Sequence, residues 1–409
     1  MAVMFTILRR RNFALLWSGQ LISRIGDWVL FLALPYYTYQ LTGSVLATGA
    51  MYLASTLPGV LLGSVAGVFV DRWSRKRTMI VMDMSRVILL LLLLAVRSRD
   101  WIWLVYLVNM LASTCSLFFT PAKNALLPSL VDKQELLTAN AWGGIGDNLP
   151  RLLGPLLGGV LLGSAGGFTS VVLIDSATFL FSGLMIWQIA VPSSLVSTLP
   201  SASQTTIGAT FLNMWREWKE GLQLLGKEHF LLIIFIAIGI TGIADSPLSV
   251  LLVPFVTTVL QSNAVGMGWI LVGRGIGGLL GGLLVALMSK VVQAVFLMIV
   301  GLVATGVCAF VLANVPHLPV AIISFTCAGV AVMLWAVSYE TLLQQHTADA
   351  YRGRVFGSFG NTAAVLAFGA LALVSATGNI IGIVPWFNMV GTLYLLAAVI
   401  ALLLVRKSR

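Results

Sequence analysis

Long apolar runs dominate the chain, and they are continuous rather than alternating with polar positions. An α-helix needs ~20 apolar residues to cross the hydrocarbon layer of a membrane, and strands of a membrane barrel would alternate in polarity instead. The sequence therefore predicts an all-α membrane protein with twelve transmembrane helices. The twelve runs lie at residues 13–40, 45–70, 79–96, 101–121, 139–163, 168–191, 230–258, 264–288, 293–314, 319–341, 355–377 and 383–405.

The break between the sixth and seventh runs divides the chain. Ser, Thr and Pro dominate the stretch from Pro192 to Thr206, which is typical of a flexible linker. The following segment spaces Phe211, Trp215 and Trp218 as in an amphipathic helix at a membrane surface. We expect a six-helix half at 1–191, a cytoplasmic linker with this helix at 192–228, and a second six-helix half at 229–409. Two such halves predict a transporter with a central cavity at their interface.

Composition and charge agree with this interpretation. Hydrophobic residues make up 59% of the 409 residues, and charged residues make up only 9%. A soluble domain could not cover so many apolar side chains with so little polar surface. If the N-terminus is cytoplasmic, eighteen Lys and Arg fall in inner segments and two, Arg97 and Arg99, in outer loops. This bias predicts that both termini are cytoplasmic. The net charge of +10 is thus a topology signal, and nucleic acid is not an expected partner.

A charged loop between the second and third runs reads GVFVDRWSRKR. Its pattern resembles the loop signature of the major facilitator superfamily. The segments WSGQLISRIGDW, LTGS, PAKNALLPSLV, GPLLGG and YRGRVFGSF narrow the resemblance to the bacterial subgroup of macrolide efflux proteins and the enterobactin exporter. The resemblance covers nearly the whole chain, and it implies that the first, fourth, seventh and tenth helices line the cavity.

The same loop is a candidate cytoplasmic gate. Asp71 lies at the C-terminal end of the second run, where the helix dipole repels an anion. The resemblance implies that the start of the eleventh helix compensates the negative charge of Asp71 when the cytoplasmic side of the transporter is closed. Pairing with Arg75 in water is the alternative, and such a pair contributes ~0–1 kcal/mol. The candidate gate residues are Gly67, Asp71, Arg72, Arg75, Arg352 and Arg354.

Two glycine patterns predict close helix packing. A glycine-rich dinucleotide site requires a preceding strand, and no strand is expected before the eighth run. We therefore expect Gly273, Gly277 and Gly281 to form a small-residue face for helix packing. The fifth run carries a GPxxGG pattern similar to an antiporter signature, although Pro150 stands where that signature has glycine. This second set consists of Gly154, Pro155, Gly158 and Gly159.

Ionisable residues at membrane depth are costly, so they are functional candidates. Asp27 and Asp245 fall about sixteen residues into the first helix of each half, which makes them candidate proton carriers facing the cavity. The other cavity candidates are Arg24, Arg274 and Glu340. Local pairs are the alternative for Arg24 with Asp27, Asp147 with Arg151, and Asp83 with Arg86. Asp175 either serves function or bonds a neighbouring helix.

The sequence thus predicts a secondary active transporter that exports an amphipathic organic molecule, drug-like or siderophore-like. Proton antiport, a monomeric state and the bacterial cytoplasmic membrane are expected, with the proton gradient as energy source and no cofactor. The fourth run lacks the Arg found in many drug–proton antiporters, so an uncoupled facilitator or a lipid-type carrier is the alternative. A transport-dead membrane sensor or scaffold is a further one. No enzyme or metal site is expected, because Cys115, Cys308 and Cys327 show no ligand spacing and no catalytic cluster stands out among three His.

Overall fold

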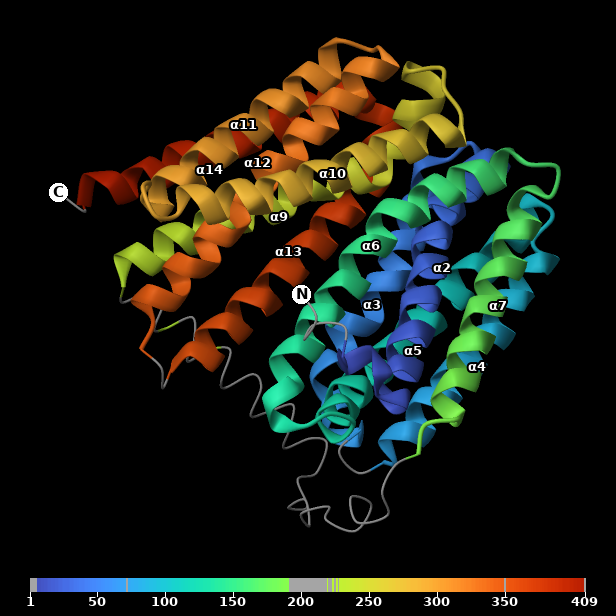
Figure 1. The fold of residues 1–409 in the computed structure, drawn as a ribbon. Helices are drawn as coiled ribbons and strands as arrows, with labels where there is room; N and C mark the ends of the chain where they lie inside the picture. Colours follow the sequence, from blue (N-terminus) through green and yellow to red (C-terminus); the bar gives the residue numbers. More distant parts are fainter. Residues whose placement is uncertain are drawn as a thin grey trace. The chain divides into compact units, whose positions relative to one another are not determined.

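The computed structural model describes residues 6–70, 73–190, 228–348 and 351–407, together with the single positions 219, 223 and 226. Every long element in these ranges is a helix, as the apolar runs predict, and Figure 1 shows them as coiled ribbons. A π-turn at Phe255–Val259 continues the seventh long helix. The long helices are α2 (Arg11–Thr42), α3 (Val45–Val70), α4 (Arg75–Leu92), α5 (Ile102–Leu126), α6 (Leu136–Gly163), α7 (Gly167–Trp187), α9 (His229–Pro254), α10 (Ala264–Met288), α11 (Ala294–Asn314), α12 (Leu318–His346), α13 (Arg352–Ile381) and α14 (Ile383–Lys407).

Ten of these twelve helices are long and apolar enough to span a membrane by composition alone, within the part of the chain that the structure describes. The two others are α2 and α6, whose apolar sequence is interrupted by polar and charged residues. Arg24 and Asp27 lie in α2, and Asp147 and Arg151 lie in α6. The chain is a multi-pass membrane protein, while the side on which its termini lie stays a prediction.

The helices group into two compact units. Unit 1 contains α2, α4 to α7 and the part of α3 from Ala54 onward, and unit 2 contains α9 to α14 and the start of α3. That start belongs to unit 2 because Val45 packs against Gly378 of α13 and Gly49 packs against Ser375 of the same helix. The predicted linker at 192–228 and its amphipathic helix lie almost entirely outside the described residues, so they stay a prediction.

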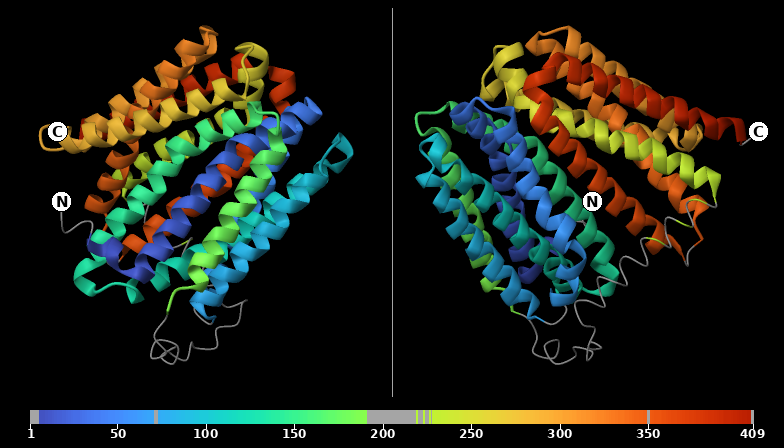
Figure 2. Two further views of the ribbon diagram at one scale, coloured as in Figure 1. Left: turned by 45° about the vertical axis from the view of Figure 1, so that its right-hand side comes forward. Right: turned by 180° about the vertical axis from the view of Figure 1, so that it is seen from behind.

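The two units repeat one pattern of helix contacts. In unit 1, α2 packs against α6 and α7, and α4 packs against α5 and α7. In unit 2, α9 packs against α13 and α14, and α11 packs against α12 and α14. The views in Figure 2 let the reader follow both groups. The first helix of each unit therefore contacts the fifth and sixth, as expected for an internal structural repeat.

Glycines allow two of these helix pairs to approach closely. On α10, a Cβ added to Gly281 would lie 2.7 Å from the carbonyl oxygen of Val330 in α12. A Cβ added to Gly277 would collide with the carbonyl oxygen of Thr326 in the same helix α12. In unit 1, a Cβ on Gly158 of α6 would lie 2.8 Å from the carbonyl oxygen of Val29 in α2. Gly154, Pro155 and Gly159 are buried on the same helix, and Gly273 is buried on α10. Close packing by small residues is thus visible at both predicted glycine patterns.

Gly277→Ala is expected to lower the free energy of unfolding by about 1–3 kcal/mol, because the added methyl group overpacks the α10–α12 contact. The matched control is Gly278→Ala, since a Cβ there would meet nothing within 4 Å. That control is expected to unfold at the same temperature as the parent or slightly above it, because alanine favours helix. Thermal unfolding of the purified protein in detergent measures both changes. Equal melting temperatures for the two variants would contradict the packing role of Gly277.

Candidate functional site

Two carboxyl groups occupy matching positions in the repeat. Asp27 lies sixteen positions after Arg11, the first residue of α2, and Asp245 lies sixteen positions after His229, the first residue of α9. The Asp27 side chain is exposed, whereas Asp245 is half-buried. No hydrogen bond or ion pair within 4 Å joins Asp27 to another described residue. Their positions relative to the helix starts show that Asp27 and Asp245 share one register in the repeat, as the sequence predicts.

Arg24 does not form the local pair with Asp27 that its spacing suggests. Its guanidinium forms an ion pair and hydrogen bond with the carboxylate of Asp147 on α6. Arg151, the other local candidate, lies 5.8 Å from the ring centroid of Trp28 on α2, as in a cation–π contact. Arg24, Asp147 and Arg151 thus each meet a side chain of the packed neighbour helix. Two of the three local pairs of the sequence interpretation are replaced by contacts between helices.

The Arg24–Asp147 pair borders a pocket inside unit 1. Gln20 and Lys123 also line this pocket, together with the apolar side of Trp17. It contains about 440 Å³ of empty space, part of which is open. The Trp17 indole donates a 2.8 Å hydrogen bond to the carbonyl oxygen of Trp142, which fixes α2 against α6 at this level.

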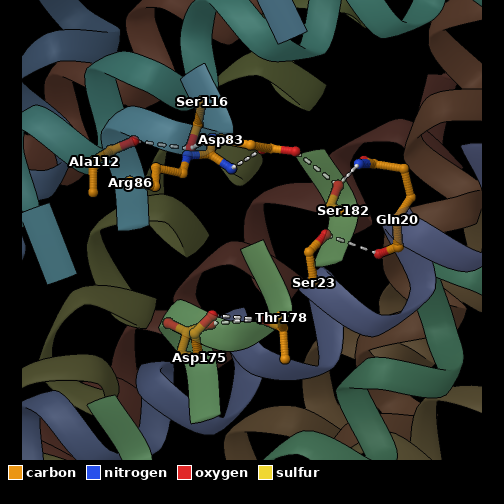
Figure 3. A network of polar contacts seen from close by, with 9 residues as sticks. All are labelled: Gln20, Ser23, Asp83, Arg86, Ala112, Ser116, Asp175, Thr178 and Ser182. Carbon is orange, nitrogen blue, oxygen red and sulfur yellow. Dashed lines mark hydrogen bonds and ion pairs between the residues drawn. The ribbon is translucent and has the colours of Figure 1, made fainter. Parts of the chain in front are cut away.

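A second polar group in unit 1, which we call the inner network, joins α2, α4, α5 and α7 (Figure 3). Ser182 donates a 2.7 Å hydrogen bond to the buried carboxylate of Asp83 and accepts one of 3.1 Å from Gln20. Arg86 lies 3.9 Å from Asp83, so the expected i,i+3 pair is present, and its guanidinium donates to the hydroxyl of Ser116 at 2.5 Å. These contacts provide the two buried charges of α4 with partners on α5 and α7, and Gln20 joins the network from α2 through Ser182.

The guanidinium of Arg86 is also held by aromatic rings. Its central carbon lies 4.9 Å from the ring centroid of Phe179 and 5.4 Å from that of Phe119. Cation–π contacts of this kind stabilise a buried cation where water is excluded. Arg86 is therefore held by Ser116, Asp83 and two aromatic rings, while its buried Nε has no hydrogen-bond partner.

Unit 2 holds a pocket around its own acid. Tyr394 of α14 donates a 2.7 Å hydrogen bond to Asp245, and Arg274 of α10 lines the same pocket. Thr305 and Ser324 add two hydroxyls to walls that are otherwise largely apolar. The pocket contains about 410 Å³ of empty space, part of it open. Its lining combines apolar side chains with an acid, a cation and a phenol.

Glu340, the remaining cavity candidate, does not line this pocket. It lies on α12 six residues before the end of that helix at His346, which corresponds to about 9 Å along the axis. Its side chain is exposed. The structure therefore brings Asp245 and Arg274 together and leaves Glu340 apart from them.

The candidate gate is only partly described. Asp71 and Arg72 lie outside the described residues, and Gly67 lies in the last turns of α3. Arg75 donates a 2.9 Å hydrogen bond to the carbonyl oxygen of Ala125 in the last turn of α5. The ammonium of Lys76 donates to the carbonyl oxygens of Trp187 and Ile189, each at 2.7 Å.

These two bases therefore cap the C-terminal ends of α5 and α7, where unpaired carbonyls and the helix dipole favour cations. In unit 2, Arg352 donates a 3.0 Å hydrogen bond to the carbonyl oxygen of Gln344 near the end of α12. The side chain of Arg354 is outside the described part. The gate role of this group stays a prediction.

Several of these residues are absent from the sequence interpretation. Tyr394 and Ser182 were missed because a single hydroxyl in an apolar helix is common and gives no signal of its partner. Their partners are acids on other helices, at a separation that no local spacing indicates. Among the described residues, no group of three or more His, Cys, Asp or Glu could hold a metal ion.

Comparison with known proteins places the chain among membrane transporters. A sequence profile of the Major Facilitator Superfamily matches residues 16–372. Macrolide efflux protein A of Streptococcus pyogenes is 24% identical over 393 residues, which cover 95% of each chain. Multidrug efflux pump Tap of Mycolicibacterium fortuitum is 25% identical over 414 residues, which cover 98% of this chain and 97% of that protein.

Two solved structures have the same fold. A bacterial homologue of the iron transporter ferroportin, in an inward-facing state, aligns with a TM-score of 0.74 at 15% identity and covers 98% of both chains. The nucleoside transporter NupG aligns with a TM-score of 0.70 at 16% identity, over 97% of this chain and 98% of that one. At these identities the likeness concerns the fold alone.

Proposed function

Because the chain belongs to the Major Facilitator Superfamily, we propose that it exports an amphipathic organic molecule across the bacterial cytoplasmic membrane by proton antiport. It is a transporter rather than an enzyme, and two relatives that match it over nearly their whole length are efflux proteins by name. Those names concern a macrolide and multiple drugs. They support a bulky, mostly apolar substrate for this chain as well.

The observation that carries the proton coupling is the matched position of Asp27 and Asp245 in the two units. A carboxyl group in a membrane helix is energetically costly, which makes it a candidate for a functional role. Asp245 is already engaged by the hydroxyl of Tyr394, whereas Asp27 is exposed and has no hydrogen-bond partner among the described residues. Asp27 is therefore the acid that is free to exchange a proton with water.

The unit 2 pocket supports the substrate class. Its walls are largely apolar, with Arg274 and Asp245 at one side and two hydroxyls nearby. Ligand pockets in proteins commonly combine apolar walls with a few placed polar groups. The chemistry of these walls suits an amphipathic molecule, because an apolar body would contact the apolar side chains and a polar group would meet Arg274 or Asp245 once the pocket widens.

Proton antiport then needs no cofactor, because the proton gradient supplies the energy. In one half of the cycle, Asp27 takes a proton from the outer side and releases its hold on substrate or on a neighbouring cation. In the other half, it returns the proton to the cytoplasm and becomes charged again. We propose that the loop of Asp71 closes the cytoplasmic side between these steps and that the protein works as a monomer.

A liposome assay tests this proposal. Purified protein is reconstituted, and accumulation of radiolabelled erythromycin and of ethidium is followed with an imposed pH gradient. The matched control is the same vesicle after a protonophore has collapsed the gradient. Accumulation that depends on the gradient supports antiport. Equilibration at the same rate with and without the gradient would favour the uncoupled facilitator and refute the coupling.

A further inference from the structure

Asp175 is a buried acid whose second carboxyl oxygen has no partner. It lies in the middle of α7, and its exposed fraction is 0%. The hydroxyl of Thr178 reaches its Oδ1 at 3.3 Å, but this hydroxyl makes a shorter bond of 2.7 Å to the backbone carbonyl of Asp175. The other oxygen, Oδ2, is buried without any hydrogen bond (Figure 3). A charge on this carboxyl would be poorly satisfied.

Three cations on the neighbouring helices, Arg86, Arg24 and Arg151, are committed elsewhere. On α4, Arg86 is bound to Ser116 and lies between two aromatic rings, beside Asp83. On α2, Arg24 forms an ion pair with Asp147 of α6. On α6 itself, Arg151 lies 5.8 Å from the ring centroid of Trp28. The short η2 segment (Leu93–Ala95), which also contacts α7, carries no charge.

A carboxylate that is fully buried without a cation or a complete set of hydrogen bonds is strongly disfavoured, and such a group takes a proton instead. Asp83 provides the contrast within the same helix bundle. It is equally buried and its Oδ1 also has no hydrogen bond, but its Oδ2 receives one from Ser182 and its Oδ1 lies 3.9 Å from Arg86. The structure thus contains two buried acids, one with a cationic partner and one without.

Asp175 is also in direct contact with the helix that carries Asp27. A Cβ on Gly26 would collide with the carboxyl of Asp175 and with the hydroxyl of Thr178. Gly26 is buried and precedes Asp27, which is exposed. A turn of about 100° per residue therefore places the two carboxyls on different sides of α2 at one level. Asp175 thus contacts the residue that directly precedes Asp27 in α2.

We propose that Asp175 is a second proton-carrying carboxyl, which exchanges its proton with Asp27 across the α2–α7 contact. This inference rests on the proton antiport proposed above. A water molecule that enters between the two helices accepts the proton as the O–H bond on Asp175 breaks and gives a proton to Asp27, so the water is unchanged and the pair keeps one proton and one negative charge. The step requires α2 and α7 to separate slightly at Gly26, where the close approach now excludes water.

The protonation of Asp175 can be tested without transport. An infrared spectrum of the purified wild-type protein at neutral pH is expected to contain the C=O band of a protonated, buried carboxyl. The band is expected to lose the intensity of one carboxyl in Asp175→Asn and to keep that intensity in Asp83→Asn, the matched control with a cationic partner. No such band in the wild type, or a band that is lost only in Asp83→Asn, would overturn the proposal.

Transport then tests the role of that proton. Asparagine has the shape of aspartate, so a merely structural Asp175 predicts normal pH-driven erythromycin accumulation by Asp175→Asn. The proposal instead predicts loss of accumulation and a changed dependence of transport on pH, with erythromycin exchange between equal concentrations retained. If the wild type ignores the gradient, the antiport itself fails. If the wild type and Asp175→Asn respond equally, only the role of Asp175 is refuted.

Discussion

Replacing Asp27 with asparagine is expected to abolish pH-driven efflux and leave erythromycin exchange between equal concentrations intact. Asparagine mimics the protonated acid in shape and charge, so the carrier keeps one protonation state and cannot return its proton. The side chain is exposed and has no hydrogen bond to lose among the described residues, so folding should be little affected. The effect is measured as erythromycin accumulation in reconstituted liposomes with an imposed pH gradient. Accumulation by Asp27→Asn is expected to fall to the level of protein-free vesicles.

Two variants serve as controls for Asp27→Asn. Asp100→Asn removes an exposed carboxyl from the short η3 segment (Arg99–Trp101) and is expected to transport normally. Asp245→Asn is expected to have a smaller effect than Asp27→Asn, because the amide oxygen can still accept the hydrogen bond from Tyr394. If Asp27→Asn, Asp245→Asn and the double variant all keep gradient-driven efflux, neither acid carries the coupling proton.

The helices were largely predictable because membrane spans leave a strong apolar signal in the sequence. The second run, at 45–70, coincides with α3, and the first, at 13–40, misses α2 by two residues at each end. The third run, at 79–96, begins four residues later than α4 does. Arg75 and Lys76 belong to that helix although they are polar, because their side chains reach the carbonyl ends of α5 and α7. Apolarity alone does not report such contacts.

The polar contacts were much less predictable. Spacing along one helix identifies neighbours three and four residues apart, and it correctly indicated Asp83 with Arg86. It also suggested Arg24 with Asp27, whereas Arg24 pairs with a residue 123 positions away. Which helix faces are packed together depends on tertiary structure, and the sequence gives no direct measure of it. The equivalent positions of Asp27 in α2 and Asp245 in α9 could be predicted because a repeat preserves the register of its helices.

The Arg24–Asp147 pair carries the second large expected effect. It joins α2 and α6, the two long helices of the described chain that are not apolar enough to count as membrane spans by composition. Removing one partner leaves the other charge uncompensated inside a helix bundle. For a fully buried pair, this lowers the free energy of unfolding by about 3–5 kcal/mol. The side chains here are 30% and 48% exposed, so we expect a smaller cost of about 1–2 kcal/mol.

Asp147→Asn and Arg24→Gln are each expected to lower the melting temperature in detergent and to slow erythromycin efflux. The exchanged variant Arg24→Asp with Asp147→Arg is expected to recover much of the stability, because it restores an ion pair between α2 and α6 with reversed orientation. Its efflux is expected to stay low, since a cation one turn before Asp27 is then replaced by an anion. Recovery of both stability and efflux would mean that Arg24 acts only as a structural partner of Asp147. Failure of the exchange to restore stability would contradict the contact between the two side chains.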